Sequence, residues 1–336
     1  MSALFTPYQL GPVTLRNRTI RSAAFESMGR AFGPTEQLKE YHVAVARGGI
    51  GMTTLAYAAV SRSGLSFDKQ LWLRPAIVPG LRDITDAVHR EGAAAAIQIG
   101  HCGNMTHYST AGQIPIGASS GFNLYAYTPV RGMRRSEIAE VARDFGRAVR
   151  TARDAGFDSV MIDGSERPLE ENIALTQRVV EMARPYGANV EAELGYVAKL
   201  GQTQGGGFTT PGDAARFVDA TGVDALAVAI GSAHGFYKQP PKLDIERLRA
   251  IHAATDVVLV LHGSSGIPHP MVQEAIANGI AKVNLATEIK DTFMRALKQR
   301  LSESEEIDLR KVFPKAVAPV VALLEEKYRM TGSATR

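Results

Sequence analysis

Two histidines and a glycine-rich segment carry residue types that bind metals and anions. His234 and His262 each follow a short apolar run, at 225–230 and 257–261. Imidazole binds zinc while neutral near pH 7, so histidines just past strand ends can ligate a metal. A structural role is the alternative for each. His262 is followed by Gly-Ser-Ser-Gly, whose backbone N–H groups can approach an anion closely, although an ordinary turn would look the same.

The elements that must position these residues alternate regularly. Helical periods such as 136–155 and 169–184 lie between apolar runs, which indicates parallel strands joined by helices. Eight such units predict an α/β fold, a closed (β/α)8 TIM barrel whose site lies on the loops after the strands. An open doubly wound sheet is the alternative, but no Gly-x-Gly-x-x-Gly follows the first strand. The predicted strands are 19–24, 51–59, 93–99, 159–162, 189–194, 225–230, 257–261 and 281–285.

We expect one barrel domain over 1–336. Glycines at 49, 92, 156 and 279 stand where helices should end. The stretch 103–134 is long for a strand–helix connection and is expected to fold over the barrel mouth. The stretch 308–327 reads as an amphipathic helix outside the eight units, either packed under the barrel or in a subunit contact, so a homo-oligomer stays open.

Composition excludes several other classes. Hydrophobic residues make up 45% and charged residues 21%, as in a soluble protein with a sizeable core. The net charge of +4 comes from scattered basic residues, which predicts no nucleic-acid partner. Cys102 is the only cysteine, so no intramolecular disulfide can form. No signal-like or membrane-spanning run is evident, so we expect no membrane partner and a cytoplasmic location.

The first half resembles the old yellow enzyme family of FMN-dependent ene-reductases. The resemblance covers about 1–160 and rests on LFTPYQLGPVTLRNRTIRSAAFES, GIGMTTLAYAAV, AAAAIQIGHCGN and TPVRGMRRSEIAEVARDFGRAVRTARDAGFD. It implies an opening hairpin that plugs the barrel base and strand ends that cradle the flavin ring. The flavin-contacting residues it implies lie in 22–25, at the end of the second strand and on the third: Ala23, Ala24, Phe25, Ala58 and Gln98.

Gln98 fits this role because an amide can hydrogen-bond the flavin edge without adding charge. The alternative is that Gln98 is a polar barrel residue whose hydrogen bonds are made within the protein. The rest of that site is incomplete. The family's His-x-x-His/Asn pattern after the fourth strand is replaced by Met-Ile-Asp-Gly-Ser at 161–165. The arginine of the fifth strand and the flavin-phosphate loops are also missing.

The second half resembles the class II ketose-bisphosphate aldolases. The resemblance covers roughly 157–330 and rests on SVMIDGSERPLEENIALTQRVVEMA, VEAELG, GVDALAVAIGSAHGFY, LVLHGSSGIP and AKVNLATEIK. It implies a divalent metal, usually zinc, that acts as a Lewis acid on the ketose carbonyl. His234 and His262 match two of the metal-binding histidines. Laying 95–101 over the family's third strand places His101 on the remaining histidine, and Glu193 is a possible second-metal ligand.

Alternatives stay open for both added ligands: His101 could cap a polar barrel mouth, and Glu193 could face the core or an ion-pair partner. The resemblance also implies a phosphate- and ketose-binding set on the last three loops, where a helix N-terminus would add its dipole. Its members are Gly235, Gly263, Ser264, Ser265, Asn284, Ala286 and Thr287.

Two departures weaken catalysis. The family's acid/base aspartate, which typically contributes 10²–10⁴-fold, is replaced by Gly100. The acidic loop of the fifth unit reads Gly-Gln-Thr-Gln-Gly at 201–205, without a carboxylate. Asp163, after the fourth strand, could interact with its own loop instead of reacting.

The change of family within about 150–163 predicts a chimera, natural or engineered, of a flavin-type half (1–160) and an aldolase-type half (161–330). Three functions follow. The first is a barrel that keeps phosphate binding and part of a metal site with weak or no aldol cleavage. The second is an FMN-binding barrel with a remnant NAD(P)H:flavin oxidoreductase site. The third is an inactive scaffold. The expected ligand is a phosphorylated small molecule, either a ketose phosphate or FMN.

Overall fold

The computed structural model describes residues 2–124, 126–165, 167–197, 207–237 and 239–334. The chain forms two compact units. The unit called N-terminal below contains Pro7–Glu193 and Asp219–Asp224, and the unit called C-terminal contains Met1–Thr6, Leu194–Val218 and Ala225–Arg336.

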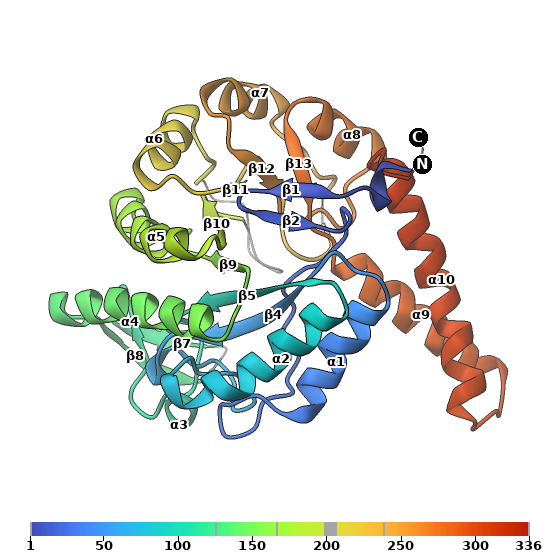
Figure 1. Ribbon diagram of the computed structural model, residues 1–336, viewed down its shortest axis with the longest axis horizontal. Helices are drawn as coiled ribbons and strands as arrows, with labels where there is room; N and C mark the ends of the chain where they lie inside the picture. The colour runs from blue at the N-terminus through green and yellow to red at the C-terminus, as the bar shows by residue number, and fades with distance from the viewer. Residues whose placement is uncertain (1, 125, 166, 198–206, 238, 335–336) are drawn as a thin grey trace. The chain divides into compact units, whose positions relative to one another are not determined.

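A parallel sheet organises the N-terminal unit (Figure 1). Its strands lie side by side in chain order: β3 (Ile20–Arg21), β4 (Met52–Ala59), β5 (Ala94–Gly100), β9 (Ser159–Ile162) and β10 (Asn189–Leu194). β4 and β9 are buried along nearly their whole length, which is why both read as continuous apolar runs and not as alternating ones. The five predicted strands of this unit are confirmed, with the first shortened to two residues.

An antiparallel hairpin precedes this sheet, as predicted. β1 (Tyr8–Leu10) pairs with β2 (Val13–Leu15) across a turn at Gly11, whose φ of +53° suits glycine. Leu10 and Leu15 pack against Met52 and Ala96 of β4 and β5. Met52 is the first residue of β4, so the hairpin covers the end of the sheet where the strands begin.

Helices connect the parallel strands of this unit: α1 (Glu36–Arg47), α2 (Val78–Arg90), α4 (Arg135–Asp154) and α5 (Leu169–Ala183). α4 buries one face through Val141, Phe145 and Val149. The helix-ending glycines were predicted correctly, because Gly49, Gly92 and Gly156 all have positive φ.

The connection 103–134 is more structured than a single loop. It contains a short helix, α3 (Tyr108–Ala111), and a small sheet of β6 (Ile116–Gly117), β7 (Gly121–Asn123) and β8 (Thr128–Gly132) in the order β6-β8-β7. Strands of two to five residues are too short to give an apolar period, and their Gly and Ser content reads as loop.

The C-terminal unit continues the alternation. Three parallel strands lie side by side in chain order: β11 (Ala225–Val228), β12 (Val258–Leu261) and β13 (Ile280–Val283). The helices of this part are α6 (Pro211–Thr221, whose last residues belong to the N-terminal unit), α7 (Ile245–Ala254), α8 (His269–Ala277), α9 (Thr287–Glu303) and α10 (Leu309–Met330). The predicted strands and the helix near 308–327 are confirmed here.

The long helices α9 and α10 lie against each other, and Phe293 stacks on Phe313 with ring centroids 6.2 Å apart (Figure 1). The buried Lys327 fixes the end of α10: its Nζ lies 3.1 Å from Glu288 Oε1 of α9 and 3.3 Å from His269 Nε2 of α8. The two ends of the chain meet nearby, where Leu4 N donates to Ser333 O at 2.7 Å.

Within the described ranges, no helix combines the length and the apolar character needed to cross a membrane. Cys102 is a free, half-buried thiol. Burial raises the pKa of this thiol to about 11, so it is protonated and unreactive near neutral pH.

Candidate functional site

The loops after β11 and β12 bring the two predicted metal histidines of the C-terminal unit together. His262 directly follows β12 and is buried, whereas His234 lies on the loop after β11 and is exposed. Their ring centroids are 6.3 Å apart. The two imidazoles are therefore neighbours, one at the base of the loops and one at the surface.

A tyrosine that was not singled out from the sequence clamps these loops. The Tyr237 hydroxyl accepts a hydrogen bond from Ala233 N and donates one to Gly263 O, both at 2.8 Å. Gly263 has a φ of +66°, and a Cβ there would lie 2.5 Å from Ala233 O. Glycine is required because the two loops touch through their backbones. The Gly-Phe-Tyr after His234 was the available signal, but sequence spacing does not show which loop the hydroxyl reaches.

The phosphate-type residues gather at the N-terminus of α9. The buried Ser265 Oγ accepts from the backbone N–H groups of Ala286, Thr287 and Glu288 at 3.3, 3.0 and 3.4 Å. Ser264 N donates to Asn284 O at 3.3 Å, which ties the loop after β12 to the loop after β13. Residues predicted from separate motifs therefore form one contact network around the first turn of a helix, where N–H groups favour negative charge.

Serine suits this place chemically. With its oxygen accepting from the helix, the Ser265 hydroxyl still has one proton that it can donate to an anion. The α9 N-cap residue, Ala286, has no side chain that could cap the helix, so Ser265 performs that role from the neighbouring loop. Gly235, the remaining member of the predicted set, has a φ of +95° in the loop after β11.

His101 is the predicted ligand that lies in the N-terminal unit, directly after β5. Its Nδ1 accepts from Gly103 N at 3.0 Å, so the neutral ring carries its proton on Nε2, which lies 3.1 Å from Ser63 Oγ. Burial, with a smaller contribution from the charge of Arg167, lowers the pKa of His101 to about 4. The imidazole is neutral at pH 7, but a metal would have to displace one of these two partners.

The flavin-type residues lie at the ends of β3, β4 and β5. Ala23 and Ala24 are partly exposed after β3, Ala58 is buried in β4, and the partly exposed Gln98 of β5 places Nε2 3.2 Å from Met161 Sδ. Phe25 stacks on Phe67 with ring centroids 4.8 Å apart. Small apolar side chains, an aromatic pair and one uncharged amide fit a flat, largely apolar ring with a polar edge.

A buried charge cluster stands behind these residues and was not predicted. Glu26 Oε1 accepts from Arg21 Nη1 at 2.7 Å and lies 3.3 Å from His42 Nε2, and Ala56 N donates to the same carboxylate. His42 Nδ1 is 2.8 Å from Thr53 Oγ1. Burial lowers the pKa of His42, so the cluster holds a neutral imidazole beside an ion pair. An Arg and a Glu five residues apart after a strand gave no recognisable motif.

The other predicted residues lie apart from this chemistry. Glu193 is buried in β10, and its backbone oxygen accepts from Asn172 Nδ2 at 2.9 Å. Asp163 Oδ1 accepts from the hydroxyl and N–H of Ser165 in its own loop. Gly100 ends β5, and a Cβ there would meet only Tyr57, at 3.6 Å. The segment 201–205 lies outside the described residues.

The donor set does not complete a metal site in the described part of the chain. No group of three or more His, Cys, Asp or Glu side chains is gathered there as metal ligands. His234 and His262 supply two ligands, while a catalytic zinc site normally uses three from the protein. The predicted zinc site therefore does not fit as a complete site within the described residues.

Two family models match the chain. The model of the NADH:flavin oxidoreductase / NADH oxidase family matches residues 3–172, and that of the class-II fructose-bisphosphate aldolases matches residues 142–336. Each match spans just over half of the chain. The chain belongs to both families. The two matches overlap at 142–172, which contains β9 and the predicted join, so the prediction of a flavin-type first half and an aldolase-type second half is confirmed.

Several solved structures resemble this two-family chain. An old yellow enzyme homologue from Zymomonas mobilis aligns with a TM-score of 0.67 and 21% identity, over 90% of this chain and 93% of that one. The structure of morphinone reductase in complex with tetrahydroNAD aligns with a TM-score of 0.67 and 18% identity, over 85% of this chain and 86% of that one. Another morphinone reductase structure aligns with a TM-score of 0.65 and 17% identity, over 84% of this chain and 85% of that one. These likenesses show the fold, the predicted α/β (β/α)8 barrel.

Proposed function

We propose that this two-family barrel binds a phosphorylated small molecule, a ketose phosphate in the first instance, without efficient aldol cleavage. The observation that supports binding is the network around Ser265, which gathers three helix N–H groups, a donatable hydroxyl proton and the loops after β12 and β13. The anion would accept the remaining proton of the Ser265 hydroxyl and would lie in the field of the α9 dipole.

Loss of cleavage follows from Gly100 and from the incomplete ligand set. Cleavage of a ketose phosphate needs a group that moves a proton to the departing aldehyde, and glycine has none. A bound divalent metal would polarise the ketose carbonyl, and His234 and His262 are the residues that would contribute to holding it. These two ligands are one fewer than a catalytic zinc site normally takes from the protein.

Calorimetric titration with dihydroxyacetone phosphate and fructose 1,6-bisphosphate tests the binding. We expect both to bind to the wild-type chain, and we expect cleavage of fructose and tagatose bisphosphates to stay at background with or without added zinc. Steady turnover by the wild type, or no binding of either sugar phosphate, would refute the proposal.

Gly100→Asp makes the test of catalysis sharper, because the backbone has room for the added side chain. If the missing carboxylate is the only defect, this variant should gain about 10²–10⁴-fold in cleavage over the wild type when zinc is present. We expect a much smaller gain, because the metal ligands are also incomplete. Gly100→Ala, which adds a methyl group without a carboxylate, is the matched control.

A second function, FMN binding, is favoured by the flavin-family match over 3–172. The ring would face the small side chains at 23, 24 and 58, with Gln98 at its polar edge. FMN would supply hydride chemistry, and the chain would position the ring and keep water from it. Protein incubated with FMN and then desalted should be yellow, and Gln98→Ala should weaken retention. Colourless protein would exclude this function.

Exposed apolar residues on α10 support self-association of the chain. Four apolar residues repeat every fourth position along α10 and are 40–61% exposed: Leu309, Phe313, Val317 and Val321. Such a stripe is typical of a helix that packs against a partner. Light scattering after gel filtration should give a mass above that of a 36.1 kDa monomer.

A further inference from the structure

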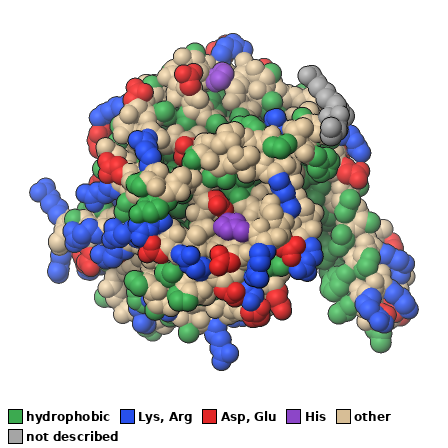
Figure 2. Space-filling view, in the orientation of Figure 1, with side chains coloured by type: hydrophobic (Ala, Val, Ile, Leu, Met, Phe, Trp, Pro, Cys, Tyr) green, Lys and Arg blue, Asp and Glu red, His purple; other side chains and the backbone are tan. Residues whose placement is uncertain are grey.

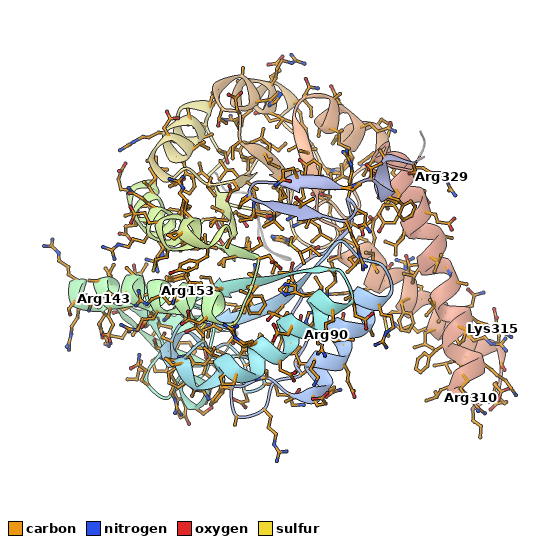
Figure 3. The ribbon with its side chains drawn as sticks, in the orientation of Figure 1. Arg90, Arg143, Arg153, Arg310, Lys315 and Arg329 are labelled. Carbon is orange, nitrogen blue, oxygen red and sulfur yellow. The ribbon has the colours of Figure 1, made fainter. Side chains whose placement is uncertain are left out.

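A groove of about 300 Å³ between α4 and α5 belongs to neither of the sites above. Four arginines line it, Arg143, Arg147 and Arg150 from α4 and Arg178 from α5, together with a single acidic residue, Glu181. Figure 2 shows basic side chains gathered over α4, and Figure 3 shows Arg143 projecting from that helix. All of these residues lie in the N-terminal unit.

The spacing in the sequence places these charges on one face. Residues 143, 147 and 150 recur at four and three positions, so their side chains lie on one side of α4. The face formed by Val141, Phe145 and Val149 is buried. Like charges at this spacing cost a helix a few tenths of a kcal/mol per pair, so helix stability does not explain them.

Most of this positive charge is unneutralised. Arg147 pairs with Asp144 of its own helix. Arg150 has its Nη1 3.5 Å from Met182 Sδ, a weak acceptor. Among the described residues, no carboxylate lies within ion-pair distance of Arg143, Arg150 or Arg178.

The floor of the groove is apolar. Gly146 faces Met182, and a Cβ at 146 would lie 3.0 Å from Met182 Cε, so the absent side chain lets α5 approach α4. The four arginines are exposed, so their attraction for an anion comes from the number of guanidinium groups gathered along one groove and weakens as salt is added.

We propose that this groove binds a small ligand carrying two or more phosphate groups. Guanidinium forks match phosphate oxygens in pairs, and three guanidinium groups without a carboxylate partner exceed what one phosphate can use. The volume is at the lower end of that of small-molecule sites, which fits a di- or triphosphate group. α4 lies within the oxidoreductase match and α5 lies mostly beyond its end, within the aldolase match, so the helix pair is assembled where the two families join.

Calorimetric titration of the full chain at low salt provides the test, with orthophosphate, pyrophosphate and tripolyphosphate as probes. We expect affinity to rise in that order. The triple variant R143Q/R150Q/R178Q should lose about tenfold in tripolyphosphate affinity per arginine, since each charge-assisted contact contributes about that factor. Glu181→Gln should bind tripolyphosphate several-fold more tightly, because it removes the one repelling charge.

Matched controls separate the groove from other sources of binding. R90Q/R295Q/R329Q removes the same charge from helices outside the groove and should bind like the wild type; Arg90 and Arg329 are labelled in Figure 3. Ser265→Ala, which alters the proposed ketose-phosphate site, should leave tripolyphosphate binding intact. If circular dichroism shows that the triple variant does not fold, the single variants Arg178→Gln and Glu181→Gln provide the test. Tripolyphosphate affinity should fall in the first and rise in the second.

Several results would overturn the inference. Unchanged binding by the triple variant, an equal loss in the control triple variant, or a loss in Ser265→Ala would place the anion elsewhere or make it nonspecific. Tighter binding of a twelve-nucleotide single-stranded DNA than of tripolyphosphate would make nucleic acid the ligand and refute a small-molecule site.

Discussion

Single side chains decide how much of each ancestral site this chain keeps. Ser265 joins the loop after β12 to the start of α9 through one oxygen atom, and Tyr237 joins the loop after β11 to the same loop after β12 through another. Gly100, by contrast, removes a functional group and leaves the backbone around it unchanged. At the scale of residues, the proposed function therefore rests on the contacts of Ser265 and on the absence of a side chain at Gly100.

Ser265→Ala should destabilise the protein by about 1 kcal/mol, because three N–H groups of α9 lose their acceptor. The free energy of unfolding from urea titration measures this effect. Ser302→Ala, which removes an exposed hydroxyl near the other end of α9, is the control and should change stability little. Ser265→Ala should also bind dihydroxyacetone phosphate more weakly than the wild type. Unchanged stability and affinity in Ser265→Ala would contradict the role assigned to this serine.

Glu26→Gln should cost about 3 kcal/mol, because it leaves Arg21 largely buried without its counter-charge. Glu36→Gln is a matched control: this glutamate also pairs with a cation, Lys39, but its side chain is 66% exposed, so the loss should stay below about 1 kcal/mol. Urea titration of both variants compares them directly. Equal losses would show that burial does not strengthen the Glu26 cluster.

At the scale of elements, Asp158 connects the start of β9 to earlier parts of the chain. Its Oδ2 accepts from Ala95 N of the neighbouring strand at 2.7 Å and lies 2.8 Å from His89 Nε2 of α2. Both contacts cross from the predicted join into the flavin-type half. The hydrogen bond to Asp158 raises the pKa of His89, although burial partly opposes the shift.

The sign of this shift gives a pH prediction. A histidine whose pKa is raised in the folded state binds its proton more tightly when the protein is folded. Its contribution to stability is therefore complete below the pKa of the unfolded state, near 6.5, and is lost as the pH rises through the pKa of the folded state. His89→Gln should therefore be less stable than the wild type at pH 5.5, by less than about 1 kcal/mol because the pair is partly exposed. At pH 9 the two should not differ. Urea titrations at both pH values measure this, and a larger difference at pH 9 would reverse the assignment.

The strands were predictable from sequence because each is a buried apolar run between helical periods, a pattern set by local side chains. The strands at 159–162 and 189–194 needed no correction. The small sheet within 103–134 was missed because its strands are too short to show a period. Motifs singled out Ser265 and Thr287, which the structure brings into contact, while their role in binding stays a prediction. The partners of His101 and the cluster around Glu26 depend on contacts between distant residues, which spacing does not encode.

At the scale of the whole molecule, the family join and the boundary between compact units do not coincide. The family matches overlap at 142–172, whereas the N-terminal unit extends to Glu193. Within that unit β9 pairs with β5 on one side and with β10 on the other. Strands of both families therefore share one continuous ladder of hydrogen bonds.

This arrangement predicts how fragments behave. A fragment of residues 1–160 ends inside β9 and should show no cooperative urea transition, because β5 loses half of its pairing with β9 and the sheet loses β10. A fragment of residues 1–193 keeps β9, α5 and all but the last residue of β10 and should unfold cooperatively. Circular dichroism against urea, with the full chain as reference, distinguishes the two. A sigmoidal transition in the shorter fragment would mean that the flavin-type half folds independently.

The burial of Lys327 has a practical consequence for following motion in the C-terminal unit. Its ammonium group is enclosed between α8 and α9, with only 6% of the side chain exposed, whereas most surface lysines react readily with amine reagents. Labelling of this one lysine, read by mass spectrometry, should occur only when α10 detaches. The extent of Lys327 labelling therefore measures how often α10 detaches from α8 and α9.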